Sequence, residues 1–329
     1  MFLNRRFLVV GGGNLGIACA ARLAASGHAV SLWTSNPSAW PRKVSVEDCD
    51  GRTYFGEWDD VSSEPNLASD VDLVFLCLPG NAMKAKLREL SAFINPNTPV
   101  AAVFGGDGFL FLSREILGID HPIMAFQRVP FICRTKIPYR VGGITGYRKM
   151  LNLAHANVQD IESWRVLFEE AFATPTRLLD NFYDAAFINS CAVMHPARLM
   201  SLQLIIDRLG PFSVAPRFYE DWDDVASEWA ISLDRELLAV ASAKGASVMP
   251  FLEYYESKDA ASLTHKIRSI PAFKGITTPL ARDGFLDTNS RYIQSDIYLS
   301  LRYMIQVASE LSIRTPVADA IWSRFKPKG

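Results

Sequence analysis

The sequence lacks the usual marks of a secreted, metal-binding or membrane protein. Only five of its 329 residues are cysteines, and no two of them have C-x-x-C spacing. We therefore expect reduced thiols, no disulfide framework and no metal site. No apolar run approaches the roughly 20 residues needed to span a bilayer. The run at residues 7–10 is too short for a signal peptide. These absences predict a cytoplasmic protein that contacts no membrane.

The chain also lacks an excess of either charge. It has 34 Lys and Arg against 35 Asp and Glu, which gives a net charge of -1. Without a basic excess, nucleic acid is not expected as a partner. Hydrophobic residues make up 49% of the chain, and single cores stop growing near about 250–300 residues. We therefore expect two domains.

In the first half of the chain, short apolar runs alternate with helical segments, a pattern that indicates a parallel, doubly wound sheet. The predicted strands are residues 7–10, 29–34, 71–78 and 99–104, and the predicted helices are residues 14–26 and 81–93. Beyond Leu179 the strand signals stop. Helices are predicted at residues 181–209, 224–243 and 292–311, the last with apolar residues at helical spacing. The fold class is therefore α/β: a Rossmann-type domain over residues 1–179 and a mainly α-helical domain over residues 180–329.

The first strand runs directly into the glycine-rich segment GGGNLG at residues 11–16, which has G-x-G-x-x-G spacing. Gly11 permits the tight turn, Gly13 lets the backbone approach a pyrophosphate, and Gly16 permits close packing of helix on strand. The helix N-terminus offers free N–H groups to the phosphates. A strand before the motif and a helix and strand after it favour a dinucleotide site over a plain turn. The residues expected to border the cofactor here are Gly11, Gly13, Asn14, Leu15 and Gly16.

The end of the second strand predicts which dinucleotide binds. An Asp or Glu there would bind the ribose 2′-OH of NAD, but Thr34 and Ser35 occupy this place. Hydroxyl groups, with Arg42 a few residues on, favour NADP; NAD stays open, and a solvated surface role is the alternative for Arg42. Leu78 and Pro79 end the next strand, where ligands bind in such sheets, although ordinary turn chemistry would also explain them.

His195 lies in a mostly apolar stretch of the second domain and precedes Pro196. Because proline disfavours helical geometry, we expect the helical run at residues 181–209 to be interrupted there. Histidine changes charge near physiological pH, which suits proton transfer. On this ground alone, a histidine buried for structural reasons is the better interpretation.

Arg291, Tyr292 and Asp296 lie around the start of the last long predicted helix. Asp296 could orient a histidine, and Arg291 could bind a substrate carboxylate through its planar fork. The alternatives are that Asp296 favours the helix dipole and that Arg291 lies on a solvated face.

The whole chain resembles the opine dehydrogenases, the octopine/nopaline dehydrogenase group. The matching segments are GGGNLG at 11–16, CLPG at 77–80, HPARL at 195–199, LDRELLAVASAKG at 233–245, PAFKGITTP at 271–279 and SRYIQSD at 290–296. The resemblance implies that His195 and Asp296 form a catalytic dyad. It also implies that Arg291, with Tyr292 beside it, helps to bind a substrate carboxylate.

The resemblance further implies a reductive condensation: an α-keto acid and the amine of an amino acid form an imine, which a hydride then reduces. A keto-acid reductase of the ketopantoate type is one alternative. Such relatives use a lysine in the early helices of the second domain, whereas this chain has no lysine from Leu151 to Ala243. A non-enzymatic NADP-binding sensor is the other alternative. The amino donor and the keto acid stay undetermined, and a homodimer stays open as the assembly.

Overall fold

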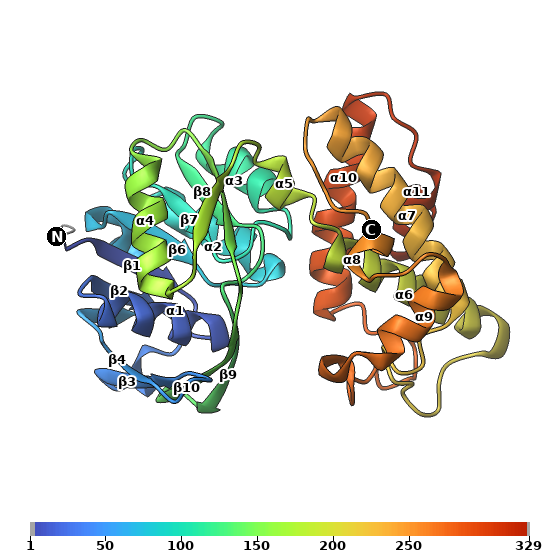
Figure 1. Cartoon of the computed structure of the whole chain (residues 1–329), viewed down its shortest axis with the longest axis horizontal. Helices are drawn as coiled ribbons and strands as arrows, with labels where there is room; N and C mark the ends of the chain where they lie inside the picture. The colour runs from blue at the N-terminus through green and yellow to red at the C-terminus, as the bar shows by residue number, and fades with distance from the viewer. Residues whose placement is uncertain (1–3, 328–329) are drawn as a thin grey trace. The chain divides into compact units, whose positions relative to one another are not determined.

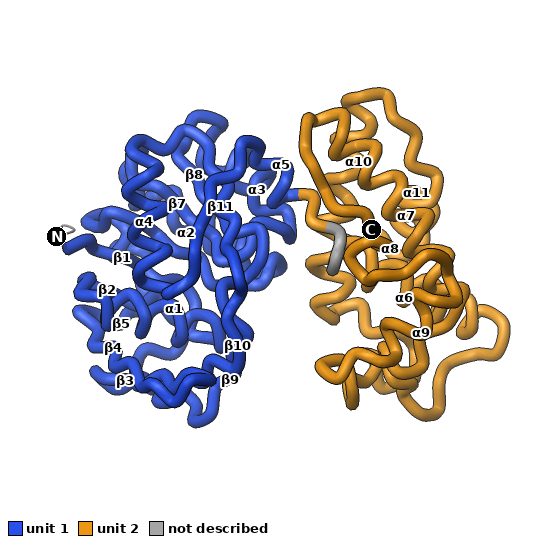
Figure 2. Tube along the Cα trace, in the orientation of Figure 1, with its two compact units in different colours: residues 1–186 blue, residues 187–329 orange. Residues whose placement is uncertain are grey.

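The computed structural model describes residues 4–327, except for the side chains of residues 189–191. It divides into two compact units, Met1–Ala186 and Phe187–Gly329, each described by itself (Figure 2). This division falls a little beyond the domain boundary expected at Leu179. No helix among the described residues is long and apolar enough to cross a membrane.

Unit 1 is built on an eight-stranded sheet in the order β12-β11-β8-β7-β6-β1-β2-β5. Its strands are β1 (Arg6–Val10), β2 (Ala29–Trp33), β5 (Asp60–Ser62), β6 (Leu73–Leu76), β7 (Val100–Ala102), β8 (Ile123–Phe126), β11 (Leu151–Ala156) and β12 (Thr176–Leu179). The neighbours pair in parallel except β11, which runs antiparallel to β8. The Rossmann-type fold class is confirmed, with β11 and β12 as an addition to the parallel sheet.

Most helical segments of unit 1 lie between strands along the chain, and α5 follows the last strand (Figure 1). They are α1 (Asn14–Ala25), α2 (Gly80–Ser91), α3 (Phe109–Leu117), α4 (Ile161–Phe172), α5 (Tyr183–Ala186) and the short 3-10 helices η1 (Pro37–Ala39) and η2 (Pro65–Asp70). All four residues of β6 are buried, as expected of a strand inside a parallel sheet.

A second sheet, which the sequence did not predict, lies beside α1 in unit 1 (Figure 1). Its strands are β3 (Lys43–Glu47), β4 (Thr53–Glu57), β9 (Phe131–Ile137) and β10 (Val141–Tyr147), in the order β4-β3-β10-β9. Gly56 explains the close approach, since a Cβ there would lie 2.9 Å from the Cα of Ala21 on α1. The sheet therefore packs against the helix that starts at the glycine-rich turn.

Unit 2 is mainly helical, as predicted, and its described residues form no strand beyond two isolated bridges. Its helices are α6 (Asn189–Leu209), α7 (Asp224–Ala243), α8 (Phe251–Tyr254), α9 (Ala260–Ser269), the 3-10 helix η3 (Pro271–Phe273), the π-helix η4 (Tyr292–Leu301), α10 (Arg302–Glu310) and α11 (Pro316–Phe325).

The predicted interruption at His195-Pro196 is wrong. Helix α6 runs from Asn189 to Leu209 with Pro196 inside it, and the chain instead leaves helical structure at residues 187–188. Every residue from 193 to 199 is buried. Packing on all sides therefore outweighs the cost of about 3 kcal/mol that a proline imposes on a helix interior.

The last predicted helix is two helices of different kinds. The π-helix η4 joins α10 end to end, and the apolar stripe expected along them is buried at Ile293, Ile297 and Leu301. These residues are four apart, a spacing that drifts around an α-helix of 3.6 residues per turn. A π-helical turn is wider than an α-helical one, and π-helical segments are frequent at functional sites.

Candidate functional site

The glycine-rich turn follows β1 and leads into α1. Gly11 has a φ of +102°, and a Cβ there would lie 2.8 Å from the carbonyl oxygen of Cys77. A Cβ on Gly16 would lie 1.8 Å from the carbonyl oxygen of Gly11. Both positions therefore exclude a side chain for reasons internal to the fold.

Gly13 differs from its neighbours, because a Cβ there would meet nothing within 4 Å. No side chain of the described residues caps the N-terminus of α1 at this position. Open space beside the unpaired N–H groups of a helix suits a pyrophosphate. The turn therefore fits a dinucleotide, and Gly13 is the glycine of the three that faces open space.

Leu78 and Pro79 lie close to this turn. The strand β1 pairs with β2 on one side and β6 on the other, so the segments after β1 and β6 meet where the strand order reverses. A Cβ on Gly11 would lie 2.8 Å from a methyl carbon of Leu78. Pro79 precedes α2, whose Gly80 N–H donates to the carboxylate of Asp107 at 3.2 Å. Asp107 was not predicted from the sequence.

Asn14 and Leu15 serve the fold with their side chains. The amide oxygen of Asn14 accepts hydrogen bonds from the backbone N–H of Thr135 at 2.8 Å and from its hydroxyl at 2.7 Å. Leu15 packs partly buried against the core. Their backbone lies at the start of α1, where helix N–H groups lack intrahelical partners. Thr135, on β9, was missed because nothing in the sequence links it to the turn.

The end of β2 presents Thr34, half-buried, and Ser35, exposed. Arg42 lies on an exposed surface and pairs with Glu57 at 3.0 Å, and Lys43 pairs with the same carboxylate at 3.1 Å. Glu57 gains a lowered pKa from these two cations, first through its hydrogen bond to Lys43. Arg42 therefore has a partner on the protein in the absence of a nucleotide.

In unit 2, His195 and Asp296 meet in the core. Nδ1 of His195 lies 2.7 Å from Oδ2 of Asp296, although 101 residues separate them in the sequence. Their exposed fractions are 3% and 4%. A buried carboxylate needs such a partner, and it holds the proton of the imidazole on Nδ1.

Tyrosines enclose the other parts of the His195 ring. The ring centroid of Tyr292 lies 4.1 Å away with an interplanar angle of 31°. The hydroxyl of Tyr219 lies 2.8 Å from Nε2 of His195. Tyr219 was missed, because it lies in the irregular segment between α6 and α7, where no periodic pattern marks it.

Arg291 precedes η4 and is exposed. Its guanidinium carbon lies 5.5 Å from the centroid of the Tyr292 ring. Arg291, Tyr292 and His195 therefore form one continuous set of contacts. An exposed cation beside a buried acid–base pair is an arrangement that can bind a carboxylate next to a proton donor.

Comparison with known proteins finds a matching family model for each half of the chain. Residues 178–327 match the family model described as NAD/NADP octopine/nopaline dehydrogenase, alpha-helical domain. The helical second half of the chain is therefore similar to the helical domain of the octopine/nopaline dehydrogenases. Residues 7–111 match a second model, described as ketopantoate reductase PanE/ApbA. The family resemblance and the fold class inferred from the sequence are thus confirmed.

Relatives of the opine dehydrogenase family align along nearly the whole chain. The opine dehydrogenase of Arthrobacter sp. (strain 1C) is 22% identical, over 98% of this chain and 90% of its own length. The opine dehydrogenase of Haliotis discus hannai is 22% identical, over 95% and 87% respectively. A solved octopine dehydrogenase with NADH and L-arginine has a TM-score of 0.82 at 23% identity, covering 98% of this chain and 89% of that one.

Proposed function

We propose that the chain is an NAD(P)-dependent opine dehydrogenase, an oxidoreductase acting on CH–NH bonds. It joins an α-keto acid to the amine of an amino acid and reduces the resulting imine. The buried His195–Asp296 pair carries this proposal, because it is an acid–base pair inside the unit that matches the octopine/nopaline dehydrogenase model. The glycine-rich turn supplies the matching dinucleotide site.

The cofactor is a nicotinamide dinucleotide, which supplies the hydride when bound. Related structures contain NADH in octopine dehydrogenase and NADP+ in yersinopine dehydrogenase. Gly13 and the N-terminus of α1 would hold the pyrophosphate. We favour NADP, since Thr34 and Ser35 end β2 without a carboxylate.

The residues of unit 2 supply proton transfer and substrate binding. His195 exchanges a proton with the amine or the carbonyl group, and Asp296 fixes its tautomer and stabilises its charged form. Arg291 binds a substrate carboxylate, and Tyr292 packs between this cation and the imidazole. The contacts that join these four residues support the role assigned to each.

A screen of NADPH oxidation that crosses keto acids with amino donors tests the function. Solved octopine dehydrogenase structures contain L-arginine, agmatine or pyruvate, so pyruvate with arginine is a natural first pair. We expect oxidation that requires both a keto acid and an amine. No oxidation with any pair, despite cofactor binding, would instead support an NADP-binding sensor.

A keto-acid reductase is the second candidate, since residues 7–111 match the ketopantoate reductase model. Such an enzyme would oxidise NADPH with a keto acid alone. The same screen separates the two functions when the amine is left out. Equal rates with and without amine would favour the reductase.

A further inference from the structure

The hydrogen bond from Tyr219 to His195 has no part in the function proposed above, although it occupies the nitrogen that would act on a substrate. Nδ1 of His195 is taken by Asp296 and Nε2 by the Tyr219 hydroxyl. Both bonds are short, at 2.7 and 2.8 Å. A proton moving between His195 and a substrate must therefore pass through Tyr219, or Tyr219 must leave.

The ring of Tyr219 is held in place by aromatic contacts on two sides. It stacks on Phe273 at a centroid distance of 4.2 Å and an angle of 19°. Phe218 meets it edge-on at 4.9 Å. Phe273 belongs to the PAFKGITTP segment at residues 271–279, one of the segments that carry the family resemblance. Such aromatic pairs favour a fixed ring geometry.

The backbone beside Tyr219 is tied to α6. Arg198, one turn after His195 and almost fully buried, donates from Nε to the carbonyl oxygen of Phe218 at 3.0 Å. Its Nη1 donates to the Asp223 carboxylate at 2.8 Å, and Ser201 joins the same carboxylate at 3.3 Å. The helix that carries His195 thus also positions its tyrosine partner.

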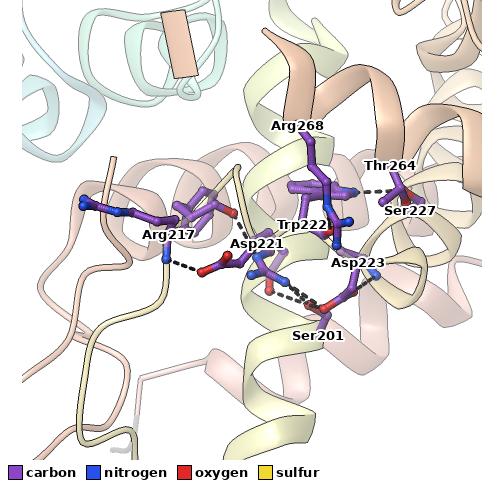
Figure 3. A network of polar contacts seen from close by, with 11 residues as sticks. Ser201, Arg217, Asp221, Trp222, Asp223, Ser227, Thr264 and Arg268 are labelled. Carbon is purple, nitrogen blue, oxygen red and sulfur yellow. Dashed lines mark hydrogen bonds and ion pairs between the residues drawn. The ribbon is translucent and has the colours of Figure 1, made fainter. Parts of the chain in front are cut away.

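The rest of the segment at residues 217–223 is tied in the same way (Figure 3). The N–H of Arg217 donates to Asp221 at 2.7 Å. Arg268 donates to the carbonyl oxygen of Trp222 at 2.6 Å, and the indole N–H of Trp222 donates to Ser227 at 2.9 Å. A segment bonded to α6, α7 and α9 in this way resists displacement by a substrate.

We propose that Tyr219 is a further catalytic residue, whose hydroxyl transfers the proton between His195 and the substrate. The inference deepens the proposed function and rests on it. A phenolic oxygen can accept the Nε2–H of an imidazolium while it donates its own hydrogen. Asp296, His195 and Tyr219 then form one proton path, with Tyr219 at the substrate end and Arg198 as a positioning residue.

The step served by this path is the loss of water from the carbinolamine formed by amine and keto acid. The nitrogen lone pair forms the C=N bond as the C–O bond breaks. The leaving hydroxyl takes the Tyr219 hydrogen and departs as water. The Tyr219 oxygen takes the proton on Nε2, so the imidazolium becomes neutral. One proton is thus transferred to the departing oxygen, and the cationic imine forms without any change of oxidation state.

The test compares Tyr219→Phe with the unaltered chain. Phenylalanine keeps the ring between Phe218 and Phe273 and removes only the hydroxyl. We expect kcat in keto-acid and amine condensation to fall about 100-fold, within the range of a positioned acid–base group. Cofactor affinity should not change, because the glycine-rich turn lies in unit 1. The double variant with His195→Ala should lose no more than the worse single variant, since the two groups act in series.

Tyr255→Phe is the matched control, because it removes a hydroxyl from another buried tyrosine of unit 2, which packs on Phe251 and Tyr254. Its kcat should stay close to that of the unaltered chain. A kcat for Tyr219→Phe within about threefold of the control overturns the proposal. A raised kcat would also overturn the proposal, because it would show that the Tyr219 hydroxyl hinders proton transfer from His195.

A second measurement separates failure of this inference from failure of the proposed function. Nitrogen NMR of His195 reports the bond at Nε2 whether or not a substrate is known. We expect the Nε2 resonance to move in Tyr219→Phe and to stay in Tyr255→Phe. An unchanged resonance overturns the relay. An unaltered chain that reduces no keto-acid and amine pair contradicts the proposed function instead.

Discussion

The two candidate sites of this chain are built in opposite ways. The nucleotide turn consists of six consecutive residues, and it depends on missing side chains, so that backbone can approach backbone. The acid–base site consists of side chains from α6, η4 and the segment between α6 and α7. It depends on buried polar groups that satisfy one another. The first site is thus local in sequence, whereas the second exists only after unit 2 has folded.

This difference predicts how each site fails. Filling space at the turn should stop cofactor binding by steric exclusion. Removing one residue of the buried series Asp296–His195–Tyr219 should stop proton transfer and leave its neighbours without hydrogen-bond partners. The four predictions below set one site or unit against the other, from the largest expected effect to the smallest.

Removing the imidazole should have the largest effect. We expect His195→Ala to lower turnover by roughly 10²–10⁴ and to leave NADPH affinity nearly unchanged. Asp296→Asn should impair the same step, because a neutral amide no longer stabilises the imidazolium. Steady-state rates and cofactor titrations on these variants and their double measure both effects.

A structural role for His195 predicts the reverse pattern. Truncation of a buried side chain would then lower the melting temperature while kcat stayed close to normal. Melting curves on the same variants distinguish the two outcomes. Near-normal kcat in a destabilised His195→Ala would remove the acid–base pair from the proposed mechanism.

Two glycine substitutions separate binding from folding in unit 1. Gly13→Val places a side chain in open space, so the variant should fold and bind NADPH about 100-fold more weakly, a loss of ~2.7 kcal/mol. Gly16→Val forces atoms onto the Gly11 carbonyl and should cost about 1–3 kcal/mol of folding stability or more. Fluorescence titration and urea unfolding measure the pair. Unchanged affinity in a folded Gly13→Val would contradict the pyrophosphate site.

Sequence reasoning found the turn because its signal lies within one strand, one turn and one helix. It singled out His195, Asp296 and Arg291 as candidates from local features, but only the family resemblance joined His195 and Asp296 as a dyad, since no local pattern joins residues 101 apart. It expected the helix to break at Pro196, where packing overrides the proline. Tyr219 stayed hidden because irregular segments carry no periodicity.

The second sheet and the π-helix were not predicted from the sequence, for a related reason. The strands β3, β4, β9 and β10 come from separate stretches of the chain, and their short apolar runs have meaning only against α1. The apolar spacing of η4 fits an α-helix almost as well as a π-helix, so the sequence predicted the buried face and not the helix type. Tertiary packing decided both features.

Cofactor preference sharpens the description of the nucleotide site. We expect kcat/KM for NADPH to exceed that for NADH by about tenfold, or ~1.4 kcal/mol, if Thr34, Ser35 and Arg42 accept a 2′-phosphate. Arg42→Ala should reduce this ratio. Arg6→Ala is the control, since Arg6 is likewise an exposed arginine in an ion pair, with Asp70. A preference for NADH would contradict the inference that Thr34 and Ser35 at the end of β2 favour NADP.

The smallest effect concerns pH and again contrasts the units. Burial lowers the pKa of His28, His121 and His155, all in unit 1, from the usual 6.5. As the pH falls through 6.5, these three histidines become protonated in the unfolded chain while they stay neutral in the folded unit. Folding stability should therefore decrease until the pH passes the folded pKa values, below which no further loss occurs.

Urea unfolding of the full chain at pH 7.5 and 5.5, followed by probes in each unit, measures this loss. We expect the larger decrease in unit 1, and we expect a combined His28→Gln, His121→Gln and His155→Gln variant to reduce it. The His121 replacement should contribute strongly, since its Nε2 is buried without a hydrogen-bond partner among the described residues, and charging that nitrogen would place an unpaired cation in the core. An equal pH response in the triple variant would mean that other groups set the acid sensitivity of unit 1.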